Sequence, residues 1–335
     1  MGHGDDNGIR LLHHAQIFPA VVVARPQHIR PASPPTSRPN LAKSTATMAA
    51  AANEAHALVI PALKRHTSTL ILLHGLGDTG KGWQFLAENF RLRRKFDECA
   101  FILPHAQKAI PVPQVRARWL LRRAGEQKPL TILQGGRMWT IPGWFNVPRQ
   151  QYGGDLLGRD DDLEGIKESI KTLHTLIDEQ IEKGIKSERI IVGGFSQGGA
   201  IALLGGLTYK HKLGGIMALS TWLACVKQMS IAPAAINPAV ADQVSQSNTS
   251  KTKIVVNAEI PINDISKDTP IFYAHGTDDN VIKYDWGMKS KEILEETYGR
   301  KVEWHRYEGM AHSACPEELE DIEHWMEKRI PPMDK

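Results

Sequence analysis

Short apolar runs alternate with longer amphipathic stretches from about residue 56 to residue 332. The runs are four to seven residues long and are bounded by polar residues or glycines, which is typical of buried strands. Strands that alternate with helices predict an α/β fold, with a mostly parallel central sheet covered by helices on both faces. The predicted strands span 69–73, 100–103, 189–195, 215–220, 270–276 and 301–307.

Two stretches have apolar residues spaced three or four apart, the pattern of an amphipathic helix. They span 162–183 and 316–329, and a third helix is predicted to begin directly after Ser196. Asp161 and Glu164 predict a capping box at the start of the first helix. Its apolar positions are Leu163, Ile166, Ile170, Leu173, Ile177 and Ile181.

Three segments do not follow this alternation. Residues 1–55 are rich in Pro, Ala, Ser and His, so we predict a disordered N-terminal extension. A transit peptide is the alternative there, and Met48 is an alternative start. Residues 111–136 and 224–264 interrupt a single predicted domain over 56–332 as atypical insertions.

Composition narrows the class of protein. Of the 335 residues, 41% are hydrophobic, which supports a sizeable core, and no apolar run is long enough to predict a membrane span. The net charge is +4, but residues 1–55 carry +2 and residues 108–137 carry +6, which leaves −4 on the rest. This distribution argues against a nucleic-acid surface. Three cysteines predict free thiols, and no His/Cys spacing predicts a metal site.

One serine lies between glycines where a predicted strand meets a predicted helix. Gly194, Ser196 and Gly198 form G-x-S-x-G, the pattern of a nucleophile elbow. Small neighbours are needed because strand and helix pack closely there, and the sharp turn exposes the hydroxyl above the sheet. The alternative interpretation is a tight turn that carries a serine by chance.

A serine nucleophile needs a base and an acid that orients the base. In an elbow fold these follow in the order Ser, Asp or Glu, His. Asp278 and Asp279 come just after the strand 270–276, and His312 just after the strand 301–307. The alternatives are that the aspartates only form a turn and that His312 caps a helix or is exposed. His275 and His305 lie in or beside predicted strands, so we predict that these two histidines are packing residues.

An oxyanion hole is also required, because the tetrahedral intermediate carries negative charge on oxygen. The predicted donors are the backbone N–H groups of Gln197 and Leu76. The loop that holds Leu76 also matches G-x-G-x-x-G, the dinucleotide pattern. The ribose-binding acid should end the second strand, but Asp97 precedes the strand 100–103, so nucleotide binding is disfavoured.

Several of these segments together resemble the acyl-protein thioesterases and related lysophospholipase/carboxylesterases. The resemblance covers about residues 56–332, apart from the two insertions. It implies an α/β-hydrolase fold and a serine esterase, without cofactor, that removes palmitoyl groups from protein cysteines, typically in the cytoplasm and in some members also in the nucleus. The segments are LLHGLGDTGKGW, ILPHA, PGWFNV, GGFSQGGAIAL, ALSTWL, HGTDDNVI and YEGMAHSACPEEL.

The resemblance also implies a role for each matching residue. Ser196 is the nucleophile, His312 the base, and Asp279 the acid, because it matches the second acidic position of HG-x-x-D. The oxyanion-hole positions are Leu76 and Gln197, and the acyl groove is lined by Trp144, Phe145, Trp222 and Leu223.

The insertions depart from the family, which is compact at both places. They are either real lid-like additions or translated non-coding sequence, and we favour the second interpretation. Peptide mapping that recovers residues 111–136 from the native protein would refute it. Three functions stay open: a hydrolase of S-palmitoylated proteins, a lysophospholipase or small-ester hydrolase, and an inactive binding protein. The chain shows no lipidation motif, so we expect membrane contact to be indirect, and without a long apolar run we expect no integral membrane association.

Overall fold

A computed structural model of the protein describes residues 56–113, 138–147, 156, 159–231 and 259–333. All of them fall in a compact unit that spans Thr45–Lys335. The predicted N-terminal extension therefore lies outside the described residues, as does most of each predicted insertion. That the expressed protein lacks these insertions stays a prediction.

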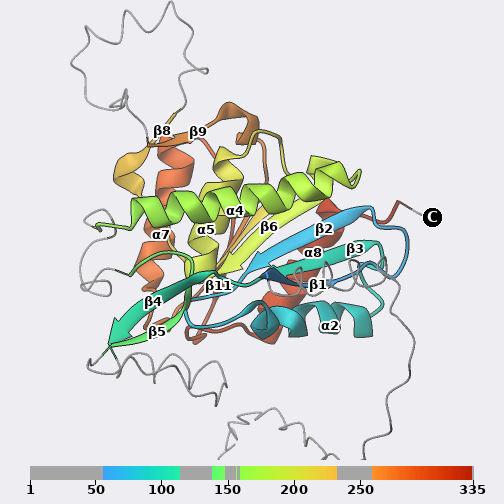
Figure 1. The fold of residues 1–335 in the computed structure, drawn as a ribbon, viewed down its shortest axis with the longest axis horizontal. Coiled ribbons are helices and arrows are strands. Elements are labelled where there is room, and N and C mark those ends of the chain that lie inside the picture. Colours follow the sequence, from blue (N-terminus) through green and yellow to red (C-terminus); the bar gives the residue numbers. More distant parts are fainter. Residues whose placement is uncertain (1–55, 114–137, 148–155, 157–158, 232–258, 334–335) are drawn as a thin grey trace, which may run out of the picture. The chain divides into compact units, whose positions relative to one another are not determined.

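A seven-stranded sheet forms the centre of the described residues (Figure 1). Its strand order is β1-β3-β2-β6-β7-β10-β11, and every neighbouring pair is parallel except β1 with β3. The mostly parallel sheet is confirmed, and each predicted strand is present to within one residue at either end. The strands are β1 (Ala57–Ile60), β2 (Ser68–Leu73), β3 (Cys99–Pro104), β6 (Ile190–Phe195), β7 (Gly215–Leu219), β10 (Ile271–Gly276) and β11 (Val302–Tyr307).

Helices cover both faces of the sheet, which is why an inner strand such as β2 is buried along its whole length, whereas the edge strand β11 is partly exposed (Figure 1). Leu70 and Leu72 of β2 pack in the cluster that includes α2 and α8, whereas Ile71 and Leu73 pack with α4 and α5. The helices are α2 (Gln84–Leu92), α4 (Leu163–Glu182), α5 (Gln197–Thr208), α7 (Tyr284–Glu292) and α8 (Pro316–Arg329). Short 3-10 turns are Gly80–Trp83, Ser187–Arg189, Val226–Gln228 and Asp264–Ser266, and a π-helical turn, Ile293–Thr297, follows α7.

The start of α4 differs by one residue from the predicted capping box. Asp162, not Asp161, is the N-cap, and its side chain accepts a hydrogen bond from the N–H of Gly165. Asp161 instead pairs with Arg159 and accepts from the N–H of Cys225. The run of three aspartates left the register of the cap ambiguous, and the tertiary partners of Asp161 decide it.

Two small sheets, which the sequence analysis did not predict, include described residues of the predicted insertions. β4 (Lys108–Pro113) and β5 (Met138–Gly143) are antiparallel, and β8 (Met229–Ile231) and β9 (Ile260–Ile262) are parallel. β8 and β9 both fall within 224–264, and β4 overlaps the start of 111–136. Each of these strands contains proline or is only three residues long, so none shows the apolar run that is typical of a buried strand. The β4–β5 pair bears on the predicted site because β5 leads directly into Trp144 and Phe145.

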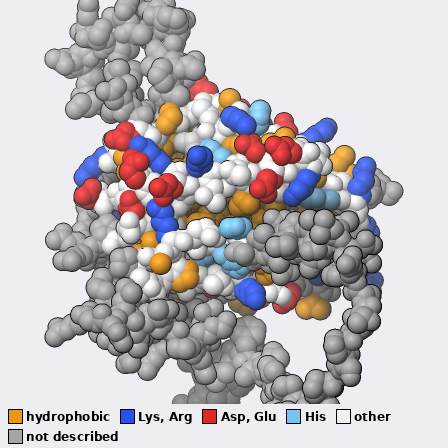
Figure 2. All heavy atoms as spheres, viewed as in Figure 1, with side chains coloured by type: hydrophobic (Ala, Val, Ile, Leu, Met, Phe, Trp, Pro, Cys, Tyr) orange, Lys and Arg blue, Asp and Glu red, His pale blue; other side chains and the backbone are white. Residues whose placement is uncertain are grey.

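The exposed face of α4 carries charges of both signs. Figure 2 shows Lys/Arg and Asp/Glu side chains interspersed on this face rather than gathered by sign. Lys167, for example, pairs with Glu164 at 3.1 Å and with Glu259 at 2.9 Å. Such mixed pairs are typical of a solvated helix face. No helix in the described ranges is long and apolar enough to cross a bilayer.

Candidate active site

The predicted site residues meet at one edge of the sheet because parallel strands end there together. His74, Gly75 and Leu76 follow β2, and Ser196 follows β6. Asp279 lies in the loop after β10, and His312 lies in the loop after β11. The fold therefore brings together segments that are up to 238 residues apart in the sequence, counted from His74 to His312.

Ser196 occupies a strained turn between β6 and α5. Its φ is +54° and its ψ is −120°, a region that residues other than glycine rarely adopt. Such a conformation costs about 1–3 kcal/mol and must be held by its surroundings. The Ser196 N–H donates to the carbonyl of Leu219 at 2.9 Å, and the Ser196 carbonyl accepts from Oγ1 of Thr221 at 2.6 Å.

The glycines of the motif are required by backbone crowding around this turn. A Cβ on Gly194 would lie 2.3 Å from the carbonyl carbon of Gly198. A Cβ on Gly198 would lie 2.4 Å from the carbonyl oxygen of Leu73. Both obstacles are backbone atoms, so no side-chain movement relieves them. This explains why the serine lies among glycines.

Replacement of Gly198 by alanine is expected to lower the free energy of unfolding by about 1–3 kcal/mol, because the new methyl group displaces the end of β2. Urea denaturation measures this. Gly205→Ala, in the same helix, is the matched control: its Cβ would meet only the Leu173 side chain, which can move. Equal losses in the two variants would contradict the role given to the motif.

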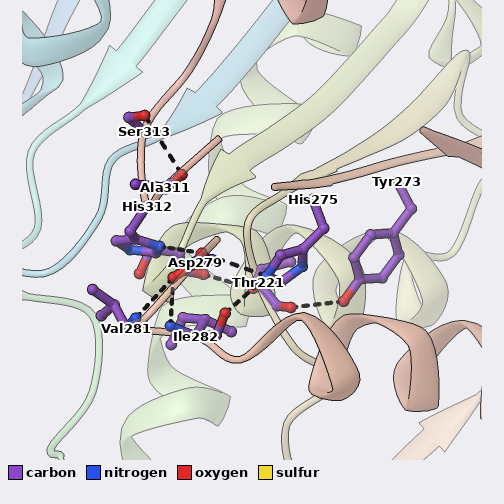
Figure 3. Close-up of polar contacts among 10 residues, drawn as sticks. Thr221, Tyr273, His275, Asp279, Val281, Ile282, Ala311, His312 and Ser313 are labelled. Atoms are coloured by element: carbon purple, nitrogen blue, oxygen red, sulfur yellow. Dashed lines mark hydrogen bonds and ion pairs between the residues drawn. The ribbon is translucent and has the colours of Figure 1, made fainter. Parts of the chain in front are cut away.

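Asp279 and His312 form a close pair (Figure 3). Nδ1 of His312 lies 2.7 Å from Oδ2 of Asp279, and Oδ1 accepts from the N–H groups of Val281 at 2.8 Å and Ile282 at 2.9 Å. Because the carboxylate only accepts, Nδ1 carries the hydrogen and the lone pair lies on Nε2. The His312 ring lies 4.6 Å, centroid to centroid, from the ring of Phe195, which precedes Ser196.

The Asp279 carboxylate is held in its charged form. Burial acts to raise the pKa of Asp279, but the contacts with His275 and His312 and the N–H of Val281 outweigh it. The resulting pKa lies well below the usual range of an aspartate, so the group is ionised at neutral pH. An ionised carboxylate can orient an imidazole and stabilise its protonated form.

The two loops that carry this pair are joined to each other. Asp278 donates its N–H to the carbonyl of Met310 at 3.1 Å, and Thr277 donates its N–H to the carbonyl of Tyr307 at 3.0 Å. The side chain of Asp278 is exposed and, among the described residues, bonds only to Thr277, whereas that of Asp279 is buried. Of the two consecutive acids, only Asp279 reaches His312.

Two backbone N–H groups lie beside the serine. Gln197 is the first residue of α5, so its N–H has no partner within the helix. The N–H of Leu76 donates to no acceptor among the described residues. A Cβ on Gly75 would lie 3.4 Å from the Cβ of Ser196, so this loop approaches the serine closely. Donors placed in this way suit an oxyanion.

The Gln197 side chain has a structural role that sequence reasoning missed. Its Oε1 accepts from the N–H of Trp144 at 2.8 Å, and its Nε2 donates to the carbonyl of Phe145 at 2.7 Å. The Trp144 indole N–H donates in turn to the carbonyl of His74 at 2.8 Å. These bonds tie the segment after β5 to Gln197 and to His74, which lies in the loop that carries Leu76.

The four predicted groove residues lie beneath this edge. Trp144, Phe145, Trp222 and Leu223 are all at most 3% exposed. The rings of Phe145 and Trp222 are 6.1 Å apart, and Arg159 lies over the Trp222 ring at 4.8 Å. The four side chains pack within the protein core, and their contact with substrate stays a prediction.

His74 holds the loop that carries Leu76 and was not predicted from the sequence. Its Nδ1 lies 2.7 Å from the carbonyl oxygen of Gly75, so Nδ1 carries the hydrogen. Its Nε2 accepts from the N–H of Ala106 at 3.0 Å. The ring is therefore neutral, and burial lowers its pKa to about 4.

Acid should weaken the fold through His74. An unfolded histidine has a pKa near 6.5, so between about pH 6.5 and pH 4 the unfolded chain binds a proton that the folded chain does not. The His74 contribution to the free energy of unfolding is fully present above pH 6.5, and the free energy of unfolding falls by about 3 kcal/mol as the pH drops to 4. Urea denaturation at pH 7.5 and 4.5 measures this. His74→Asn, which does not titrate, should lose less stability over the same interval; an equal loss would contradict the assignment.

The dinucleotide pattern in the same loop has a different use. Gly77 donates its N–H to the carbonyl of Pro142 at 2.8 Å, and Gly80 packs against the carbonyl of Leu103. Asp97, the acid in that pattern, forms ion pairs with Lys64 at 3.4 Å and Arg91 at 3.8 Å. In the part of the chain that the structure describes, no group of three His, Cys, Asp or Glu side chains is placed to hold a metal ion.

Comparisons with known proteins point to one group. A profile of the family described as phospholipase/carboxylesterase matches residues 54–119, 107–247 and 249–330. Acyl-protein thioesterase 1 of Gibberella zeae is 42% identical over 277 residues, which cover 82% of this chain and 96% of that protein. Acyl-protein thioesterase 1 of Neurospora crassa is 37% identical over 274 residues, with 82% and 91% covered.

Solved structures share the fold. The crystal structure of Arabidopsis thaliana SOBER1 matches with a TM-score of 0.56 at 24% identity, over 79% of this chain and 99% of that one. Acyl-protein thioesterase 2 of Zea mays matches with a TM-score of 0.53 at 22% identity, over 82% and 98%.

Proposed function

Because the chain belongs to the phospholipase/carboxylesterase family, whose members are α/β-hydrolase esterases, we propose that it cleaves thioester-linked palmitoyl groups from protein cysteines. In this proposal Ser196 is the nucleophile, His312 the base and Asp279 the orienting acid. The observation that carries it is the 2.7 Å contact between Asp279 and His312, on the sheet edge that also holds the strained Ser196.

The proposed reaction has two halves. Nε2 of His312 takes the proton of Ser196 as Oγ attacks the acyl carbonyl carbon, and the N–H groups of Leu76 and Gln197 stabilise the oxyanion. The carbon–sulfur bond breaks, the cysteine sulfur leaves with that proton, and the acyl group stays on Oγ. Water then gives a proton to His312, attacks the same carbon and releases the fatty acid as Oγ recovers a proton.

A thioester suits this arrangement because its leaving group is stable. A cysteine thiol has a pKa of about 8.5, so its sulfur leaves with little help, whereas an alkoxide must be protonated as it departs. The relatives at 42% and 37% identity bear the name acyl-protein thioesterase 1. Lysophospholipids and small acyl esters are the alternative substrates, and a cytoplasmic or nuclear location stays a prediction.

A matched pair of substrates tests the proposal. We expect kcat/KM for an S-palmitoylated cysteine peptide to exceed, by about tenfold or more, that for the same peptide with O-palmitoyl serine and that for lysophosphatidylcholine. Fatty-acid release is measured for each, with the Ser196→Ala variant as the background. Preference for lysophosphatidylcholine would favour the lysophospholipase alternative instead.

A further inference from the structure

A second histidine contacts Asp279. His275, at the end of β10, lies on the side of the carboxylate away from His312 (Figure 3). Its Nε2 is 3.4 Å from Oδ2 of Asp279, the same oxygen that lies 2.7 Å from Nδ1 of His312. The side chains of His275 and Asp279 are both fully buried. One carboxylate oxygen is thus shared by two imidazoles.

The hydrogen-bond partners of His275 fix where its hydrogen lies. Nε2 is 2.9 Å from the carbonyl oxygen of Ile282, which can only accept, so Nε2 carries the hydrogen. Nδ1 is buried and has no partner among the described residues, and a Cβ on Gly287 would lie only 2.4 Å from it. A hydrogen on Nδ1 would therefore have no acceptor.

This arrangement closes the turn that carries the acid. Oδ1 of Asp279 accepts from the N–H groups of Val281 and Ile282, and the Ile282 carbonyl accepts from His275. Hydrogen bonds thereby hold the turn at Asp279 and at Ile282, and the Nε2–H of His275 lies beside Oδ2 of Asp279. The positive end of an N–H dipole beside Oδ2 reduces the negative potential that His312 meets.

The His275 ring is fully buried between elements that pack against it. The Trp304 indole of β11 is nearly parallel to it, at 25°, with a centroid distance of 6.4 Å. Tyr284 of α7 is a titratable group on another face, 5.9 Å from it. Arg306, its ladder neighbour on β11, is exposed and pairs with Glu308.

We propose that His275 is a positioning residue for this site, resting on the triad of the proposed function. It holds the turn that carries Asp279, and its Nε2–H takes up part of the Oδ2 charge, so that His312 is less basic than an unshared carboxylate would make it. A carboxylate shared in this way keeps His312 in the unprotonated, working form to lower pH.

Two substitutions of equal length separate this role from packing. His275→Gln retains an N–H donor at the ε position, and His275→Met does not. The measurement is kcat/KM for an S-palmitoylated peptide between pH 5 and 9. The result that matters is the pH at which kcat/KM falls on the acidic side (the acidic limb), rather than its maximum value. We expect the limb to move about 0.5 pH unit higher in His275→Met and to stay at the wild-type position in His275→Gln.

Several outcomes would overturn the proposal. They are an unchanged or lowered limb in His275→Met, or an equal shift in both variants. If the methionine variant does not fold, ¹⁵N-histidine NMR of the wild-type protein decides: hydrogen on Nε2 of His275 is expected, and hydrogen on Nδ1 alone refutes it. The triad itself fails separately, if Ser196→Ala retains thioester hydrolysis, whatever His275 does.

Discussion

Replacement of Ser196 by alanine is expected to lower kcat/KM for a thioester substrate by about 10⁴- to 10⁶-fold. The substitution removes the oxygen that carries the acyl group in the proposed mechanism, while the hydrogen bonds that hold this strained residue, to Leu219 and Thr221, remain. The expected melting temperature is therefore close to that of the wild-type protein. Single-turnover hydrolysis measures the first effect, and thermal unfolding measures the second.

Ser220 provides a matched control for this experiment. It is another buried serine at the same sheet edge, with a φ of +44°, and its hydroxyl has no hydrogen-bond partner in the described chain. Ser220→Ala should therefore retain activity to within a few-fold. If Ser196→Ala kept a tenth or more of the wild-type activity, or if both variants lost activity equally, Ser196 would not be the nucleophile.

Asp279→Asn is expected to lower kcat by about 10³- to 10⁴-fold without unfolding the protein. Oδ1 of Asp279 accepts from two N–H groups, so the carbonyl oxygen of asparagine must take that place. Its NH₂ group then faces Nδ1 of His312, which must become an acceptor. The hydrogen of His312 moves to Nε2, and the imidazole can no longer take the proton of Ser196.

Asp278, the residue before Asp279, provides the matched control for the loss of kcat in Asp279→Asn. Asp278 is exposed, and Asp278→Asn should leave kcat within about twofold of the wild-type value. Steady-state kinetics at pH 8 tests both variants. The assignment of the acid would be wrong if Asp278→Asn were the more damaged, or if Asp279→Asn lost less than tenfold.

The sequence predicts those features of the molecule that are encoded locally. Strands covered by helices on both faces appear in the sequence as apolar runs. The Gly194–Gly198 motif predicts an elbow because a side chain at either glycine would collide with nearby backbone atoms. The order Ser196, Asp279, His312 also follows from where loops lie after parallel strands. The family resemblance, rather than spacing, selected Asp279 over Asp278, and burial of the Asp279 side chain gives that choice its physical reason.

The parts that sequence reasoning missed depend on distant partners. The role of the Gln197 side chain appears only when β5 brings Trp144 to it, and β5 has no apolar run that marks it as a strand. His74 acquires its fixed tautomer from Ala106, and His275 acquires its own from Ile282. None of these contacts can be predicted from the sequence alone.

Covalent labelling tests the central claim most directly. A fluorophosphonate probe should react with the native protein, and peptide mapping should place the adduct on Oγ of Ser196 and nowhere else. Labelling should disappear in Ser196→Ala and slow greatly in Asp279→Asn. A folded, active protein that carries the adduct on another residue, or that hydrolyses thioesters without being labelled, would contradict the account.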